Sequence, residues 1–179
     1  PSVSQIQSIN SFMAIKSNYD LLLRAQYLVE LSEKFFSEEA NNNPQLEILI
    51  ETINQLSKTD HPDLVILVYE FELLKSHGFG LRIFECLNCS KSLTKSSNYF
   101  SYTNGGFYCE SCLGEVHAKE ELVKFSVEDQ VIFRSIERKT YNELLNLDIK
   151  DLSIKKLSGM LRKSISNVLG VQLKTSRFL

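Results

Sequence analysis

The chain has 179 residues, of which 43% are hydrophobic and 23% are charged, and its formal net charge is −2. These values are typical of an ordinary globular protein with one domain, or with a main domain and a small insert. The longest unbroken apolar run, residues 64–69, is too short to span a membrane, and no secretory signal is visible. The sequence therefore predicts a soluble intracellular protein, in a compartment where disulfides rarely persist.

Charge is distributed unevenly along the chain. Residues 1–149 carry 13 Lys or Arg against 21 Asp or Glu, a net charge of −8. Residues 150–179 carry seven basic residues against Asp151 alone, a net charge of +6. A basic end on an acidic body indicates contact with a polyanion or with an acidic partner peptide, although a solvated helix face would give the same pattern.

The first half of the chain has the apolar spacing of helices. Asn43 and Pro44 have the residue types of an N-cap and a first helical position, and His77-Gly78 has the features of a helix end. The fourth segment is apolar on nearly all sides, so we expect it to be the most buried helix. The apolar periodicity predicts helices over residues 3–15, 19–36, 44–56 and 60–77.

This regularity breaks between residues 79 and 113, where Ser, Asn, Thr and Gly cluster. Two short strands are predicted there, at residues 99–102 and 107–108, around an Asn-Gly-Gly turn. Helices are expected to return after Gly114. The signals for them are two sequences that resemble capping boxes, 126–129 and 140–143, and a last apolar stripe over 152–169.

All the cysteines form two Cys-x-x-Cys pairs with nineteen residues between them. Each pair places two sulfur atoms within one turn of backbone, and a hairpin between the pairs brings them together as a tetrahedron. This spacing predicts one structural Zn²⁺ ion, because four thiolate ligands leave no open position for catalysis. A disulfide interpretation needs an oxidising compartment, and iron is the remaining alternative metal. The four predicted ligands are Cys86, Cys89, Cys109 and Cys112.

No catalytic constellation is visible in the sequence. It has no Gly-rich phosphate loop, no Gly-x-Ser-x-Gly elbow and no His-Glu-x-x-His motif. His117 could replace a cysteine as a metal ligand, although a solvent-facing position fits it better, and His61 and His77 suit helix ends. We therefore expect a protein that is not an enzyme.

The basic end is the better functional candidate. One side of the last predicted helix is apolar and is expected to face the core, whereas the other side carries Lys and Arg. Such a surface could neutralise DNA phosphates, without sequence preference and with strong salt dependence, or bind an acidic peptide. The candidate residues are Lys155, Lys156, Arg162, Lys163, Lys174 and Arg177.

Several motifs resemble, in the same order, those of the C-terminal part of RecO, the bacterial recombination and DNA-repair mediator. Together they cover nearly the whole chain, and in the last of them Ser176 stands where an arginine is usual. The motifs are 23–31 (LRAQYLVEL), 71–79 (FELLKSHGF), the two Cys-x-x-Cys pairs with Asn104-Gly105-Gly106 between them, and 173–179 (LKTSRFL).

The resemblance implies a non-catalytic role in recombinational DNA repair. RecO-like proteins bind single- and double-stranded DNA, anneal complementary strands, and engage the acidic C-terminal tail of the single-stranded-DNA-binding protein so that the recombinase can load. They usually begin with an oligonucleotide-binding β-barrel that contributes to DNA binding and contacts the partner RecR, and residues 1–16 are too few to form one. Together with a start at Pro1, this indicates a fragment or processed chain, or a member that lacks the barrel. The implied location is cytoplasmic, in association with the nucleoid.

The expected fold is mainly α, a helical bundle with an inserted four-cysteine zinc hairpin similar to a zinc ribbon. We expect the helical domain to comprise residues 1–81 and 115–179, with the basic end in the second part, and the hairpin to comprise residues 82–114. Two alternatives to a DNA-binding mediator stay open. One is a protein-interaction module that docks repair partners while only the barrel contacts DNA. The other is a nuclease that carries the zinc hairpin as an accessory.

Overall fold

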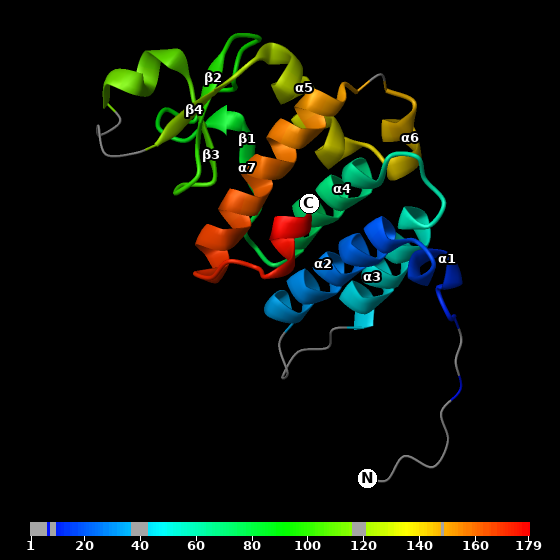
Figure 1. Cartoon of the computed structure of the whole chain (residues 1–179). Helices are drawn as coiled ribbons and strands as arrows, with labels where there is room; N and C mark the ends of the chain where they lie inside the picture. The colour runs from blue at the N-terminus through cyan, green and yellow to red at the C-terminus, as the bar shows by residue number, and fades with distance from the viewer. Residues whose placement is uncertain (1–6, 8–9, 37–42, 116–120, 148) are drawn as a thin grey trace.

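The computed structural model describes residues 7, 10–36, 43–115, 121–147 and 149–179. Helices make up most of these residues, and a small sheet lies at one end of the molecule (Figure 1). The helices are α1 (Met13–Lys16), α2 (Tyr19–Phe35), α3 (Asn43–Leu56), α4 (Pro62–Ser76), α5 (Val127–Arg138), α6 (Tyr141–Leu145) and α7 (Asp151–Leu169), with the 3-10 helices η1 (Glu110–Glu115) and η2 (Thr175–Phe178). The strands are β1 (Arg82–Cys86), β2 (Asn98–Ser101), β3 (Gly106–Tyr108) and β4 (Leu122–Phe125).

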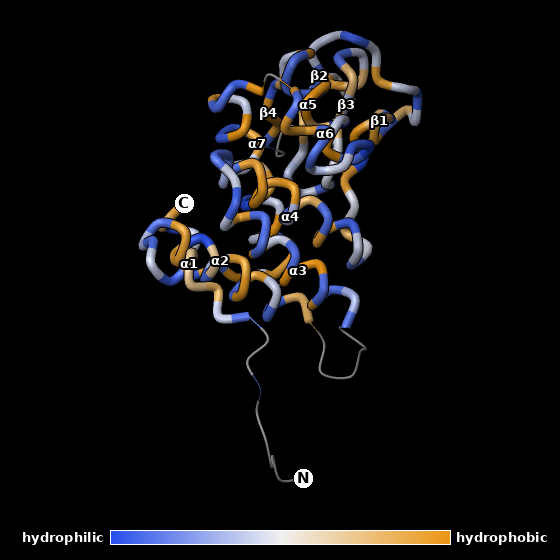
Figure 2. The backbone as a smooth tube through the Cα atoms, turned by 90° about the vertical axis from the view of Figure 1, so that its right-hand side faces the viewer, coloured by the Kyte–Doolittle hydropathy of each residue, from blue (hydrophilic) through white to orange (hydrophobic). Residues whose placement is uncertain are grey.

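Helix α4 is the centre of the helical part. Nine of its fifteen residues are buried, and it packs against α2, α3, α5 and α7. In Figure 2 it lies between the sheet at one end of the molecule and α1–α3 at the other. Pro62 starts the helix, and the His77 ring nitrogen Nδ1 lies 2.9 Å from the carbonyl oxygen of Leu73 at its end. The expected position and burial of this helix are confirmed.

Capping residues mark ends of several other helices. The side chain of Asn18 accepts hydrogen bonds from two N–H groups in the first turn of α2, and Ser126 accepts one at the start of α5. Thr140 and Glu143 form a complete capping box at α6, and Gly170, with φ of 65°, follows α7. Of the helix predicted over residues 3–15, residues 3–6 and 8–9 fall outside the described residues. Residues 7 and 10–12 are not helical, so the prediction was wrong there, and α1 begins only at Met13, after Phe12 with its positive φ of 48°. No helix that the structure describes is long and apolar enough to cross a membrane.

The sheet has the strand order β1-β3-β2-β4. Strands β2 and β3 form the predicted hairpin, β1 lies parallel to β3, and β4 lies antiparallel to β2. The helices expected after Gly114 are present and begin at the two predicted capping sites, but strand β4, which precedes α5, was not predicted. Four residues carry too little periodicity to show a strand, and β4 forms because β2 offers it an edge to pair with.

Aromatic side chains join the sheet to the helices in one hydrophobic core. Phe100, Phe107 and Phe125 come from β2, β3 and β4, are fully buried, and have ring centroids 5.2–6.0 Å apart. The same core contains Phe71 of α4 and Phe133 of α5, whose ring centroids are 5.3 Å apart. A sheet of this size cannot bury a core alone, so the helices fix its position and that of the cysteines on it.

Candidate metal centre and basic pocket

The two cysteine pairs follow the ends of neighbouring strands. Cys86 is the last residue of β1, and Cys109 comes directly after β3. Because β1 and β3 are parallel neighbours, both pairs lie at the same edge of the sheet. A tight turn follows each strand: the N–H of Ser90 donates to the carbonyl of Cys86, and the N–H of Cys112 to that of Cys109, both over 3.0 Å. These turns bring the second cysteine of each pair back to the first.

The four sulfur atoms form one compact cluster. All four Sγ atoms lie within 4.8 Å of one another, and those of Cys89 and Cys109 are 3.9 Å apart. Four thiolates placed tetrahedrally around Zn²⁺ at about 2.3 Å lie about 3.8 Å apart, so the spacing fits such a site. All four are free cysteines. The predicted ligands are therefore brought together and could hold a metal ion, whereas His117 lies outside the described residues.

Hydrogen bonds change the pKa values of two thiols in this cluster. Burial raises the pKa of Cys86, but hydrogen bonds from the N–H groups of Cys109, Cys89 and Asn88 lower this pKa overall, to about 6. A bond from the Asn88 side chain lowers the pKa of Cys112, but burial and bonds to the other three sulfur atoms raise it to about 12. The Cys86 thiol thus ionises more readily than that of Cys112, and a metal ion would supply the positive charge that stabilises a thiolate.

Gly106 allows β1 and β3 to lie close enough for the two cysteine pairs to meet. A Cβ atom at this position would lie 2.9 Å from the carbonyl oxygen of Arg82 and 2.9 Å from Cδ2 of Leu87. Any larger residue would therefore push β1 away from β3 and separate the cysteine pairs. The cluster is packed in an apolar shell, which limits its contact with water. This shell includes Leu87, Leu93, Tyr108, Leu113 and Leu122.

Two of the six basic candidates attach α7 to the sheet region. Lys156 forms an ion pair with Asp129, and its Nζ lies 4.5 Å from the ring centroid of Phe125. Lys163 forms an ion pair with Glu121, directly before β4. Burial raises the pKa of Asp129, but hydrogen bonds from Lys156 and Ser126 lower it overall. These two lysines therefore have structural partners within the chain.

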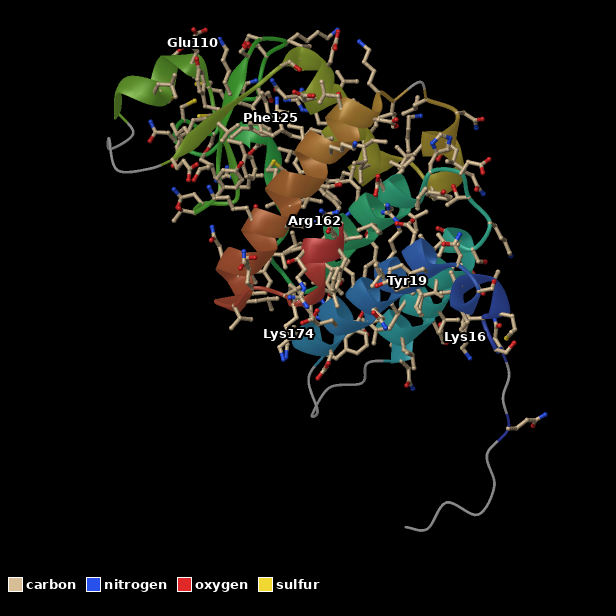
Figure 3. The ribbon with its side chains drawn as sticks, in the orientation of Figure 1. Lys16, Tyr19, Glu110, Phe125, Arg162 and Lys174 are labelled. Carbon is tan, nitrogen blue, oxygen red and sulfur yellow. The ribbon has the colours of Figure 1, made fainter. Side chains whose placement is uncertain are left out.

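Arg162 meets a carboxylate in the core. Its Nε donates to Oε1 of Glu70 over 3.1 Å, and the hydroxyl of Tyr27 donates to the same oxygen over 2.5 Å. Figure 3 labels Arg162 on α7. Glu70 is fully buried, and burial raises its pKa to about 7 although Arg162 and Tyr27 counteract the shift. Sequence analysis missed Glu70, whose signal was a carboxylate inside the apolar fourth helix.

A pocket of about 490 Å³ lies between α2, α4, α7 and η2, and we call it the basic pocket. Lys155 and Arg162 line it, so the structure brings two of the basic candidates together. Arg24, from α2, is a third cation there and is held by Asp20 and Asp63. Its complete lining is Arg24, Asp63, Lys155, Ser158, Gly159, Arg162, Phe178 and Leu179.

The remaining two candidates lie on the C-terminal segment. The backbone N–H of Lys174 donates to the carboxylate of Glu30 over 2.9 Å, which attaches this segment to α2. The guanidinium of Arg177 lies 4.8 Å from the ring centroid of Phe178, which is 40% exposed. Among the described residues, no carboxylate forms an ion pair with Lys155, Lys174 or Arg177. Of the six predicted basic candidates, these three are therefore available to a ligand.

Comparison with known proteins places this geometry in a family. The family described as "Recombination protein O C terminal" matches residues 16–177. A protein named DNA repair protein RecO from Dehalococcoides mccartyi is 29% identical over 178 residues, which are 99% of this chain and 69% of the relative. A protein of the same name from Caldicellulosiruptor saccharolyticus is 31% identical over 174 residues, 97% of this chain and 64% of the relative.

The similarity extends to more distant relatives. The protein of this name from Shouchella clausii is 23% identical over 179 residues, 100% of this chain and 68% of the relative. The chain thus spans about two thirds of the length of the relatives that it matches. The family match covers almost every residue, including both cysteine pairs and the lining of the basic pocket except Phe178 and Leu179, so the chain belongs to the RecO C-terminal family.

Proposed function

We propose that this chain is the tail-binding, zinc-bearing part of a non-catalytic RecO-type mediator of recombinational DNA repair. Membership of the RecO family supports a role in DNA repair. The observation that carries the finer proposal is the basic pocket, because it combines cations with an exposed aromatic ring. The C-terminal tail of the single-stranded-DNA-binding protein is acidic and ends in hydrophobic residues, and a pocket of this composition suits it.

Different groups of the basic pocket would recognise the acidic part and the hydrophobic end of the tail. Lys155 has no carboxylate partner among the described residues, and Arg162 shares its charge with a carboxyl whose pKa is about 7. Near neutral pH that carboxyl is partly protonated, so the charge of Arg162 is only partly neutralised and can attract the acidic part of the tail. Phe178 offers an apolar surface to the hydrophobic end. Within the described chain the buried hydroxyl of Ser158, which also lines the pocket, has no hydrogen-bond partner.

The metal in this proposal is one Zn²⁺ ion held by Cys86, Cys89, Cys109 and Cys112. The sulfur spacing and the four-thiolate donor set support zinc. Bound there, the ion would supply the positive charge that four thiolates need and would tie β1 to β3. The chain's own part is to orient the sulfur atoms through the two turns and to shield them with the apolar shell.

The tail-binding proposal can be tested on the intact chain. The probe is a fluorescein-labelled, Asp-rich peptide that ends in a free Phe, and its anisotropy is measured against protein concentration. We expect Lys155→Ala and Phe178→Ala each to weaken binding by roughly tenfold, because each removes one of the two recognised features. The control is Lys95→Ala, an exposed lysine of the sheet region. Equal affinity of all four proteins would refute the proposal.

Direct DNA contact is a second candidate, favoured by the free cations Lys155, Lys174 and Arg177. Phosphate neutralisation by these residues predicts binding of a labelled single-stranded oligonucleotide that weakens steeply with salt. Double-stranded DNA is expected to bind through the same phosphate contacts. If this chain binds no DNA at low salt, the alternative holds: the chain docks repair partners, and DNA and the RecR-type partner are contacted by another part of the protein.

A further inference from the structure

A second groove, between α3, α4 and α6, has the opposite charge, and we call it the acidic groove. It has a volume of about 540 Å³. Its lining residues on α3 and α4 recur at helical spacing, so it follows both helices lengthwise. From Pro44 to Gln55 a helix rises about 16 Å, which is the length of three helical turns. The groove is therefore long enough to receive a short helix.

The floor of the acidic groove is apolar. Val65 is buried at its base, Val68 is half-buried, and Tyr69 closes it from below. Ile48 lies at the edge of the groove and is 48% exposed, which is a high exposure for an isoleucine. An apolar side chain of a partner could cover all of these residues at once.

The rim of the groove is negative and has no counter-charge. Glu47 and Glu51 lie four residues apart on α3, a like-charge spacing that weakens a helix, and Glu72 faces them from α4. The described residues that line the groove include neither Lys nor Arg, and α3 contains none. Among the described residues, these three carboxylates form no ion pair.

We propose that the acidic groove binds a basic, amphipathic helix of a partner protein. The apolar side of such a helix would cover Ile48 and Val68, and its Lys or Arg side chains would pair with Glu47, Glu51 and Glu72. Charge complementarity selects this occupant, because the same rim repels both an acidic peptide and DNA. The groove therefore suits a partner different from the ligands of the basic pocket.

The proposal is tested with a designed probe, a fluorescein-labelled helical peptide with Leu on one side and Lys on the other. Its anisotropy is measured with wild-type protein and with Glu47→Gln/Glu51→Gln. The matched control is Glu33→Gln/Glu128→Gln, which removes two exposed carboxylates elsewhere. We expect roughly a fivefold or larger loss of affinity in the first double variant and no change in the control. Ile48→Ser should also weaken binding, and circular dichroism should show that the peptide gains helix in the complex.

Three results would overturn the proposal. The first is no binding by the wild-type protein, and the second is equal loss of affinity in both double variants, which indicates a general charge effect. The third is equal binding of a peptide with Ser in place of every Leu, which shows that the apolar floor plays no part. Sedimentation of the wild-type chain and of Ile48→Ser tests whether a second copy of this chain occupies the groove instead. Self-association that Ile48→Ser abolishes would assign the groove to a second copy of this chain.

Discussion

The wild-type protein should lose stability as the pH rises through the pKa of Glu70, and replacing Glu70 by Gln should remove this loss. The Glu70 carboxyl is fully buried, and its pKa of about 7 compares with an ordinary value of 4.5. The folded state therefore binds its proton more tightly than the unfolded state. The stability that this carboxyl contributes is fully present below pH 4.5 and is lost as the pH rises through about 7. A shift of this size corresponds to roughly 3 kcal/mol.

Urea unfolding of both proteins, followed by circular dichroism across this pH range, measures the effect. Gln cannot ionise, so the free energy of unfolding of the wild type should fall relative to Glu70→Gln by roughly 3 kcal/mol between the acidic and the alkaline limit. Taking the difference removes the contributions of groups that do not interact with Glu70. Glu33→Gln, on the exposed side of α2, is the control for the loss of a surface carboxylate. A difference that is constant with pH, or that rises with pH, would refute the reasoning.

Three further predictions concern the metal centre and one helix cap. Cys86→Ser should lose the one zinc ion per chain that we expect in the wild type by metal analysis, and a chelator should lower the melting temperature of the wild type only. Gly106→Ala should destabilise the fold by about 1–3 kcal/mol in urea unfolding, because its Cβ meets backbone, and should also release the metal more readily. Thr140→Ala should cost about 1 kcal/mol by the same assay, because it removes the capping box of α6; full stability would show that tertiary packing alone holds that helix.

The parts of the fold that follow from local chemistry were predictable from the sequence. The boundaries of α4 are set by Pro62 and Gly78, and α6 begins at its capping box, all of which depend on neighbouring residues only. The cysteine cluster was equally visible, because each Cys-x-x-Cys pair has a local geometry of its own and the sheet then brings the two pairs together.

Features that depend on distant contacts were not predictable. Strand β4 exists because β2 offers it an edge, and four residues of sequence do not reveal this. The helical spacing of α7 correctly separated an apolar side from a basic side. It could not show that Lys156 and Lys163 form ion pairs with Asp129 and Glu121. The basic pocket also takes Phe178 from the C-terminal segment, whose return to the bundle depends on contacts with α2.

The central claim is that the basic pocket itself receives an acidic, hydrophobic-ended tail, and NMR of the isotope-labelled chain tests it most directly. The unlabelled Asp-rich peptide ending in Phe is added stepwise, and the backbone amide shifts are followed. The account predicts that the largest changes occur at Lys155, Gly159 and Phe178, whereas amides of the acidic groove, such as that of Ile48, stay in place. Changes that centre on the acidic groove or the sheet, or no changes at all, would contradict it.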